Sequence, residues 1–163
     1  MKLSIREMVL TSLFTSLTAI GAFLSIPIGE VSITLQSMFS LLSGLLLGPK
    51  LGCISQGLYV LLGLIGIRIF ANFSGGPQHI FKPSFGFLVG FIFASYVVGK
   101  LTYKRQSLSF KRIFLSTLFG TFIIYLFGVP YMYFVLNHIM GKGMDFLTVL
   151  KIGCLIFIPG DLI

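Results

Sequence analysis

The chain has 163 residues, of which 56% are hydrophobic and only 10% are charged, whereas an ordinary soluble domain carries roughly 25% charged residues. Its 12 Lys and Arg and 4 Asp and Glu residues are too few to cover the surface of a soluble protein of this size. The same hydrophobicity excludes a disordered chain. The composition therefore predicts an all-α integral membrane protein.

The net charge of +8 is concentrated rather than spread, because five of the 12 basic residues lie within residues 100–112. A phosphate-binding surface distributes its charges along a groove, so we interpret the cluster as a membrane-topology signal and expect no nucleic-acid partner. Cys53 and Cys154 have no partner at CxxC or His spacing. They predict neither a zinc site nor a disulfide.

Five apolar runs are long enough, or nearly long enough, to cross a membrane, which takes about 20 helical residues. They cover residues 8–28, 33–47, 51–70, 83–98 and 113–136. The second run is short and contains Gln36, so we expect one of its ends to lie in protein rather than lipid. Gly48 and Pro49 predict a tight turn after it, and Pro130 predicts a kink in the fifth.

The distribution of Lys and Arg predicts a multi-pass protein of the cell membrane with a cytoplasmic N-terminus. That orientation puts eight of the 12 basic residues inside, namely Lys2, Arg6, Lys50, Lys100, Lys104, Arg105, Lys111 and Arg112. It leaves Arg68, Lys82, Lys142 and Lys151 outside. The connections near residues 28–32, the Gly-rich residues 71–82 and the segment after Asn137 then face the exterior.

The end of the chain does not form a sixth span of ordinary length. Residues 146–158 contain Lys151 and are followed by Pro159 and Gly160, so we expect a short helix at the outer face. Pro159 is placed to begin a further helix, with Asp161 near its positive end. Because the sequence stops at Ile163, we interpret that last helix as largely missing and the sequence as truncated.

Polar side chains inside apolar runs are candidates for a ligand site, because they are costly in lipid. Gln36, Asn72 and Asp161 all fall near the outer ends of their predicted helices and can converge on one pocket. We expect aromatic lining from Tyr59, Phe70, Phe73 and Phe87. The alternative is that each polar group bonds a neighbouring helix. Lys82 and Arg68 flank the pocket and can meet an anion or anchor at headgroups.

Other functions have less support in the sequence. The chain has no Walker A motif, so ATP hydrolysis must come from another subunit. An intramembrane enzyme built on His138, Asp145 and Asp161 lacks a HExxH motif or paired carboxylates. Metal capture by His79 and His138 with nearby methionines lacks ligand spacing.

Four segments resemble the BioY family, the biotin-binding S components of energy-coupling factor (ECF) transporters. They are ITLQ at residues 33–36, LSGLLLGPKLG at 42–52, YVLLGLIG at 59–66 and IPGDLI at 158–163. The resemblance covers almost the whole chain. It implies a single six-helix domain over residues 1–163, which captures biotin from outside and associates with a membrane coupling subunit and two ATPases. It implies no enzyme activity and no cofactor.

The resemblance also assigns roles to residues. Gln36, Asn72 and Asp161 would serve the ureido ring of biotin, and Lys82 its carboxylate. The family's first helix carries an Ala-xxx-Ala motif that packs on the coupling subunit, and Ser12 and Ser16 hold these positions here with the same spacing. An S component for a different vitamin remains the alternative.

Overall fold

The computed structural model describes residues 3–28, 31–103 and 109–155. These residues form six α-helices, one β-hairpin, two short 3₁₀ helices and one π-helical turn. The α-helices are α1 (Ile5–Phe23), α2 (Gln36–Leu47), α3 (Pro49–Ile65), α4 (Phe85–Thr102), α5 (Phe110–Phe134) and α6 (Phe146–Leu155). The remaining elements are β1 (Ser25–Ile28), β2 (Val31–Thr34), η1 (Ala71–Phe73), η2 (Pro77–Phe81) and η3 (Val135–Ile139).

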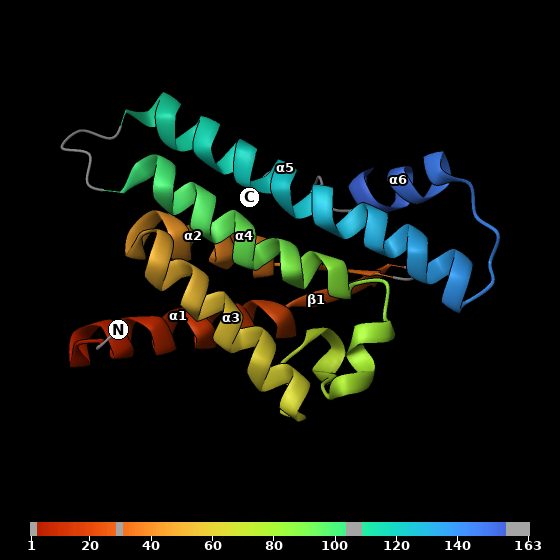
Figure 1. The fold of residues 1–163 in the computed structure, drawn as a ribbon, viewed down its shortest axis with the longest axis horizontal. Coiled ribbons are helices and arrows are strands. Elements are labelled where there is room, and N and C mark those ends of the chain that lie inside the picture. Colours follow the sequence, from red (N-terminus) through yellow and green to blue (C-terminus); the bar gives the residue numbers. More distant parts are fainter. Residues whose placement is uncertain (1–2, 29–30, 104–108, 156–163) are drawn as a thin grey trace.

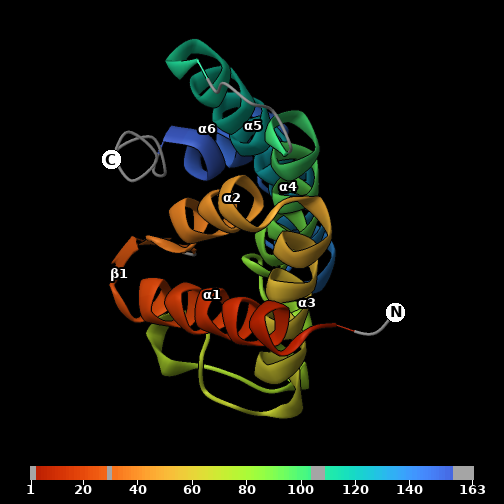
Figure 2. The ribbon, with the colours of Figure 1, turned by 90° about the vertical axis from the view of Figure 1, so that its left-hand side faces the viewer.

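The helices pack in a bundle whose two ends differ. Helix α4 lies at its centre, in contact with α2, α3 and α5, and Figure 2 shows α1 at one side of the bundle and α5 with α6 at the other. The start of α1 and the turn between α2 and α3 lie at one end of the bundle (Figure 1). The hairpin and the segment that contains the 3₁₀ helices η1 and η2, here called the 3₁₀ segment, lie toward the other end. The bundle therefore has a loop-rich end.

Helix α1 begins with a capping box, and one of its sides packs into the bundle while the other is exposed. The Ser4 hydroxyl accepts a hydrogen bond from the Glu7 backbone N–H, and the Glu7 carboxylate accepts one from the Ser4 N–H at 2.8 Å. Further along, Thr15 is buried and its hydroxyl lies 3.0 Å from the Ser55 carbonyl oxygen of α3. The threonine face of α1 thus packs into the bundle.

A buried polar network joins α1, α2 and α3. The Gln56 side chain is fully buried, and its amide nitrogen donates to the Thr18 hydroxyl at 3.1 Å and to the Ser43 hydroxyl at 3.3 Å. Ser43 in turn donates to the Ser40 carbonyl oxygen at 2.6 Å. Buried polar groups need such partners in an apolar core. Gln56 therefore has a structural explanation that does not involve a ligand.

Helices α2 and α4 are in close contact at Gly44 of α2, which has no side chain. A Cβ atom added at Gly44 would lie 2.3 Å from the Ser95 carbonyl oxygen, so the backbones meet directly. Small residues permit this kind of close approach between membrane helices. Further toward the start of α4, Phe87, Leu88 and Phe91 are buried in the core.

The hairpin corrects the sequence-based boundaries of the first two apolar runs. Helix α1 ends at Phe23, and the chain then forms β1 and β2, which pair antiparallel with Ile26 opposite Ile33. The β-branched residues of both strands favour extended backbone. Helix α2 has only 12 residues, which corresponds to about 18 Å, and its first residue is Gln36. The second run therefore begins with the last two residues of β2 and is otherwise mostly helix.

The later boundaries follow the predictions more closely. Helix α3 ends at Ile65 and is capped by Gly66, where φ is +118°, and α5 continues through Pro130 to Phe134 and the turn η3. Within the described ranges, α4 and residues 110–139 are long and apolar enough to cross a membrane. Helix α6 packs against α5 and buries Val149 completely. The expectations for residues 156–163 lie outside the described residues.

The contact between α2 and α4 gives a test of the packing. Gly44→Ala places a methyl group against the Ser95 backbone, so we expect it to destabilise the fold by about 1–3 kcal/mol. Gly57→Ala is the control, because a Cβ at Gly57 meets nothing within 4 Å. Thermal unfolding in detergent should show a lower midpoint for Gly44→Ala and an equal or higher one for Gly57→Ala. Equal midpoints in the two variants would contradict the close crossing.

Candidate functional site

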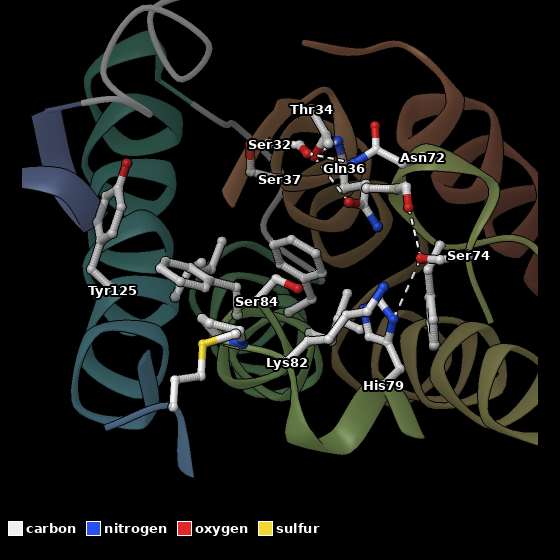
Figure 3. A pocket seen from close by; sticks show the side chains of 18 residues that line it. Ser32, Thr34, Gln36, Ser37, Asn72, Ser74, His79, Lys82, Ser84 and Tyr125 are labelled. Atoms are coloured by element: carbon white, nitrogen blue, oxygen red, sulfur yellow. Dashed lines mark hydrogen bonds between the residues drawn. The ribbon is translucent and has the colours of Figure 1, made fainter. Parts of the chain in front are cut away.

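A cavity of about 290 Å³ lies at the loop-rich end of the bundle. Its wall comes from β2, the start of α2, residues 70–84, α4, α5 and the segment after η3. Figure 3 shows the side chains that line it. They belong to Ser32, Thr34, Gln36, Ser37, Phe70, Ala71, Asn72, Ser74, His79, Lys82, Pro83, Ser84, Phe87, Leu88, Phe91, Ile124, Tyr125 and Met140.

The cavity has two kinds of wall. Helices α4 and α5 contribute buried apolar side chains, among them Phe87, Phe91 and Ile124. The hairpin, the start of α2 and residues 70–84 contribute the serine and threonine hydroxyls and the amide and imidazole groups, and α5 adds the phenol group of Tyr125. Lys82 is the charged residue among the described lining residues. Such a site suits a small ligand that has an apolar body and one strongly polar edge.

The amide of Gln36 is held in one orientation by a chain of three hydrogen bonds. The Tyr59 hydroxyl donates its proton to the Ile69 carbonyl oxygen at 2.9 Å, so it can only accept from Gln36. The Gln36 amide nitrogen donates to it at 2.6 Å, and the Thr34 hydroxyl donates to the Gln36 amide oxygen at 3.0 Å. Gln36 keeps one N–H and one oxygen lone pair without a partner in the described part of the chain.

The side chain of Asn72 links separate elements at the loop-rich end of the bundle. Its amide nitrogen donates to the Ser32 hydroxyl at 2.9 Å, and its amide oxygen accepts from the Ser25 hydroxyl at 3.2 Å. It therefore links η1 to both strands of the hairpin. Its backbone has φ of +58°, in the left-handed region that Asn tolerates better than most residues. One N–H and one lone pair of this amide also have no partner among the described residues.

The side chain of His79 forms part of the same wall and is only 3% exposed. Its ring lies 4.4 Å from the Phe70 ring, and its Nδ1 is 3.4 Å from the Ser74 hydroxyl oxygen. Burial, and then the positive charge of Lys82, lower the pKa of His79 to about 4. The imidazole is therefore neutral at physiological pH.

The structure brings most of the predicted site residues to this cavity. Gln36, Asn72 and Lys82 line it, as do Phe70 and Phe87. Tyr59 is fully buried behind the wall and holds Gln36. Asp161 lies outside the described residues.

Phe73 has a different place from the one expected. Its ring is 63% exposed and stacks on Phe23 of α1, with ring centroids 4.7 Å apart. The expectation that Phe73 lines the pocket is not met, because the ring packs on α1 instead. The contact fixes η1 against the end of α1, next to Asn72.

Ser12 and Ser16 lie on the exposed side of α1, a helix that contributes no residue to the described lining of the cavity. Their hydroxyls donate to the Met8 and Ser12 carbonyl oxygens, at 2.9 and 3.0 Å. Both polar groups are thus satisfied within their own helix. What they present outward is a small side chain between exposed apolar residues such as Val9 and Leu13.

Sequence reasoning missed several lining residues. Ser32 and Thr34 lie on β2, a strand that was expected to be helix or loop. The sequence indicates at most a metal ligand at His79, and it gives no sign that Ser74 lies at the cavity. Thr34 bonds the side chain of Gln36, but the N-cap position of α2 belongs to Leu35, which has no capping side chain. The usual capping pattern therefore does not mark Thr34 in the sequence. The burial of His79 likewise has no signal in the sequence.

The comparisons with known proteins agree with one another. The family model described as "BioY family" matches residues 1–163. A "Biotin transporter BioY" from Thermotoga maritima is 40% identical over 158 residues, covering 97% of this chain and 88% of the relative. The "Biotin transporter BioY" from Lactococcus lactis subsp. cremoris is 32% identical, covering 98% of this chain and 84% of the relative.

A solved structure has the same fold. It is the crystal structure of "the S-component for biotin from an ECF-type ABC transporter", with a TM-score of 0.82 and 31% sequence identity. The match covers 96% of this chain and 83% of the solved chain. Family model, relatives and fold agree over nearly the whole length, and the chain is therefore a member of the BioY family.

Proposed function

We propose that the chain is the membrane-embedded S component that captures biotin from the exterior for ATP-driven uptake by an ECF transporter. Relatives with this name and a solved biotin S component, all aligned over most of their length, support the proposal. The absence of a Walker A motif fits a binding subunit that depends on separate ATPases. The chain itself catalyses no reaction.

The observation that carries this proposal is the pair of half-satisfied amides above an apolar wall. Gln36 and Asn72 each offer one N–H and one lone pair. The ureido ring of biotin has two N–H donors and one carbonyl, and it can bond to such amides through both kinds of group. The thiophane ring then lies against Phe87 and Phe91, which are buried apolar residues of the wall.

Other contacts complete the proposed complex. Lys82 is exposed and lines the cavity, so its ammonium group can pair with the valerate carboxylate. Tyr59 acts through Gln36, whose amide it orients. We keep Asp161 as a further acceptor for the ureido N–H groups, on the strength of the IPGDLI segment alone.

The arrangement in the membrane follows from the two ends of the bundle. We propose a multi-pass topology with the N-terminus in the cytoplasm and the cavity toward the exterior. The described basic residues Arg6, Lys50, Lys100, Lys111 and Arg112 lie on segments that this topology places inside. This matches the excess of Lys and Arg found in cytoplasmic loops.

The exposed side of α1 is the proposed contact with the transporter. We infer that the chain works with a membrane coupling subunit and two ATPase subunits, and that Ser12 and Ser16 face the coupling subunit. Their small side chains let a partner helix approach closely, and their hydroxyls require no bond from it.

The direct test of function is binding of biotin by the purified protein in detergent. Isothermal titration should give saturable binding of biotin and none of thiamine or riboflavin at the same concentrations. The physical reason is that the two amides match a urea edge rather than a charged or larger ring. Binding of another vitamin with no binding of biotin would contradict the proposal.

Gln36→Leu tests the role of the amide. It removes a donor and an acceptor from the cavity, so we expect biotin affinity to fall by about 10- to 100-fold. Gln56→Leu is the matched control, because Gln56 is also a buried glutamine but belongs to the network with Thr18 and Ser43. It should lower the unfolding midpoint and leave the affinity of the folded protein unchanged. Equal affinities in both variants would refute the assignment of Gln36.

Ser12→Leu and Ser16→Leu test the docking face. A larger side chain should push a partner helix away, so we expect biotin uptake by cells to fall while biotin binding by the purified protein stays normal. Thr117→Leu on α5 is the control, because Thr117 likewise bonds a carbonyl oxygen of its own helix. Full uptake by both serine variants would contradict docking through α1.

A further inference from the structure

The imidazole of His79 has no role in the contacts proposed so far, although it is fixed in the cavity wall. Its backbone N–H donates to the Gly76 carbonyl oxygen at 3.0 Å, and its own carbonyl oxygen accepts from the Lys82 N–H at 3.0 Å. The Tyr131 hydroxyl of α5 donates to the carbonyl oxygen of the next residue, Ile80. The backbone on both sides of the ring is therefore held in place, and the ring itself packs against Phe70 and Ser74.

The neighbours of the ring decide which nitrogen carries the proton. The Ser74 hydroxyl donates its proton to the Ala71 carbonyl oxygen at 2.7 Å. Its oxygen can then only accept from Nδ1 of His79, which lies 3.4 Å away. Nδ1 is therefore the protonated nitrogen of the neutral ring. Nε2 carries a lone pair and is a hydrogen-bond acceptor.

Nothing in the described structure uses that acceptor. Across residues 3–28, 31–103 and 109–155, no group bonds Nε2 of His79. The side chain is 97% buried from solvent, yet it lines the cavity (Figure 3). Lys82 is the charged group whose field reaches the ring, and it opposes protonation. No fully buried side-chain nitrogen or oxygen of the described residues lacks a hydrogen-bond partner, so the unbonded Nε2 reaches open space, and the cavity that His79 lines provides it.

We propose that Nε2 of His79 accepts a hydrogen bond from an N–H group of the bound ligand and makes His79 a specificity-determining residue of the cavity. The inference rests on the proposed function, because it takes that N–H to belong to the ureido ring of biotin. A carboxylate has no proton to donate to Nε2 and is repelled by its lone pair, so this contact favours the urea edge. His79 and Gln36 thus bind the same edge of the ligand, and Lys82 its anionic end.

The test compares two variants of His79 with two ligands. His79→Phe keeps an aromatic ring against Phe70 and removes the acceptor, whereas His79→Gln keeps an acceptor oxygen. The ligands are biotin and biotinamide, which share the ureido ring and differ in the carboxylate. Gln78→Ala is the matched control, because Gln78 is exposed and bonds Gly75 outside the lining. Thermal unfolding checks that each variant folds, and His79→Leu replaces His79→Phe if the latter does not.

We expect the variant without the acceptor to bind both ligands about 10- to 100-fold more weakly. His79→Gln should recover most of the affinity, and Gln78→Ala should bind like the unmodified protein. Unchanged affinity in a folded His79→Phe or His79→Leu protein would overturn the inference. A loss seen with biotin but absent with biotinamide would also overturn it, because His79 would then serve the carboxylate. Failure of the unmodified protein to bind biotin would instead reject the proposed function.

Discussion

The orientation of the Gln36 amide depends on the hydroxyl of Tyr59, and the proposed ligand site depends on that orientation. A primary amide can rotate to exchange its oxygen and nitrogen at little cost when its neighbours permit it. Here the Ile69 carbonyl oxygen takes the Tyr59 proton, and the Tyr59 oxygen must receive the Gln36 N–H. Thr34 binds the amide oxygen from the other side. The groups left for a ligand are therefore defined before it arrives.

The elements around this chain of bonds have unequal roles. Helices α4 and α5 give the apolar wall, and they are the two long apolar helices of the described structure. The hairpin and the 3₁₀ segment give the polar wall, and Asn72 ties these two parts together through Ser25 and Ser32. Because Asn72 is also a proposed ligand contact, binding acts on the same side chain that holds the loops. Asn72 therefore belongs both to the proposed ligand site and to the contacts between the hairpin and the 3₁₀ segment.

The positions of the long helices can be predicted from the sequence, because a lipid bilayer requires apolar helices of a defined length. The helix positions of α3, α4 and α5, and the gathering of Gln36 and Asn72 at one end, follow from apolar runs and alternating direction. The apolar runs predict the two strands, Ser25–Ile28 and Val31–Thr34, wrongly. A short apolar run reads equally well as strand or helix, and only the pairing of Ile26 with Ile33 decides it.

Side-chain positions were less predictable than helices. An aromatic residue near a site can face the ligand or a neighbouring helix, and Phe73 packs on Phe23 because its backbone turns at η1. His79 lies among Gly, Pro and Gln, a composition typical of an exposed loop. Its burial comes from the folding of residues 70–82 back onto α3, where Gly63 leaves room for the Phe70 ring. No local pattern encodes that long-range contact.

The central claim is that the Gln36 amide, held by Tyr59, meets the urea edge of biotin. A crystal structure of the protein bound to biotin tests it most directly. The account predicts the ureido ring within about 3 Å of both the Gln36 amide and Nε2 of His79, which is an ordinary hydrogen-bond distance, with the Gln36–Tyr59 bond retained. A ureido ring placed against α4 and α5 away from Gln36, or an amide released from Tyr59, would contradict it.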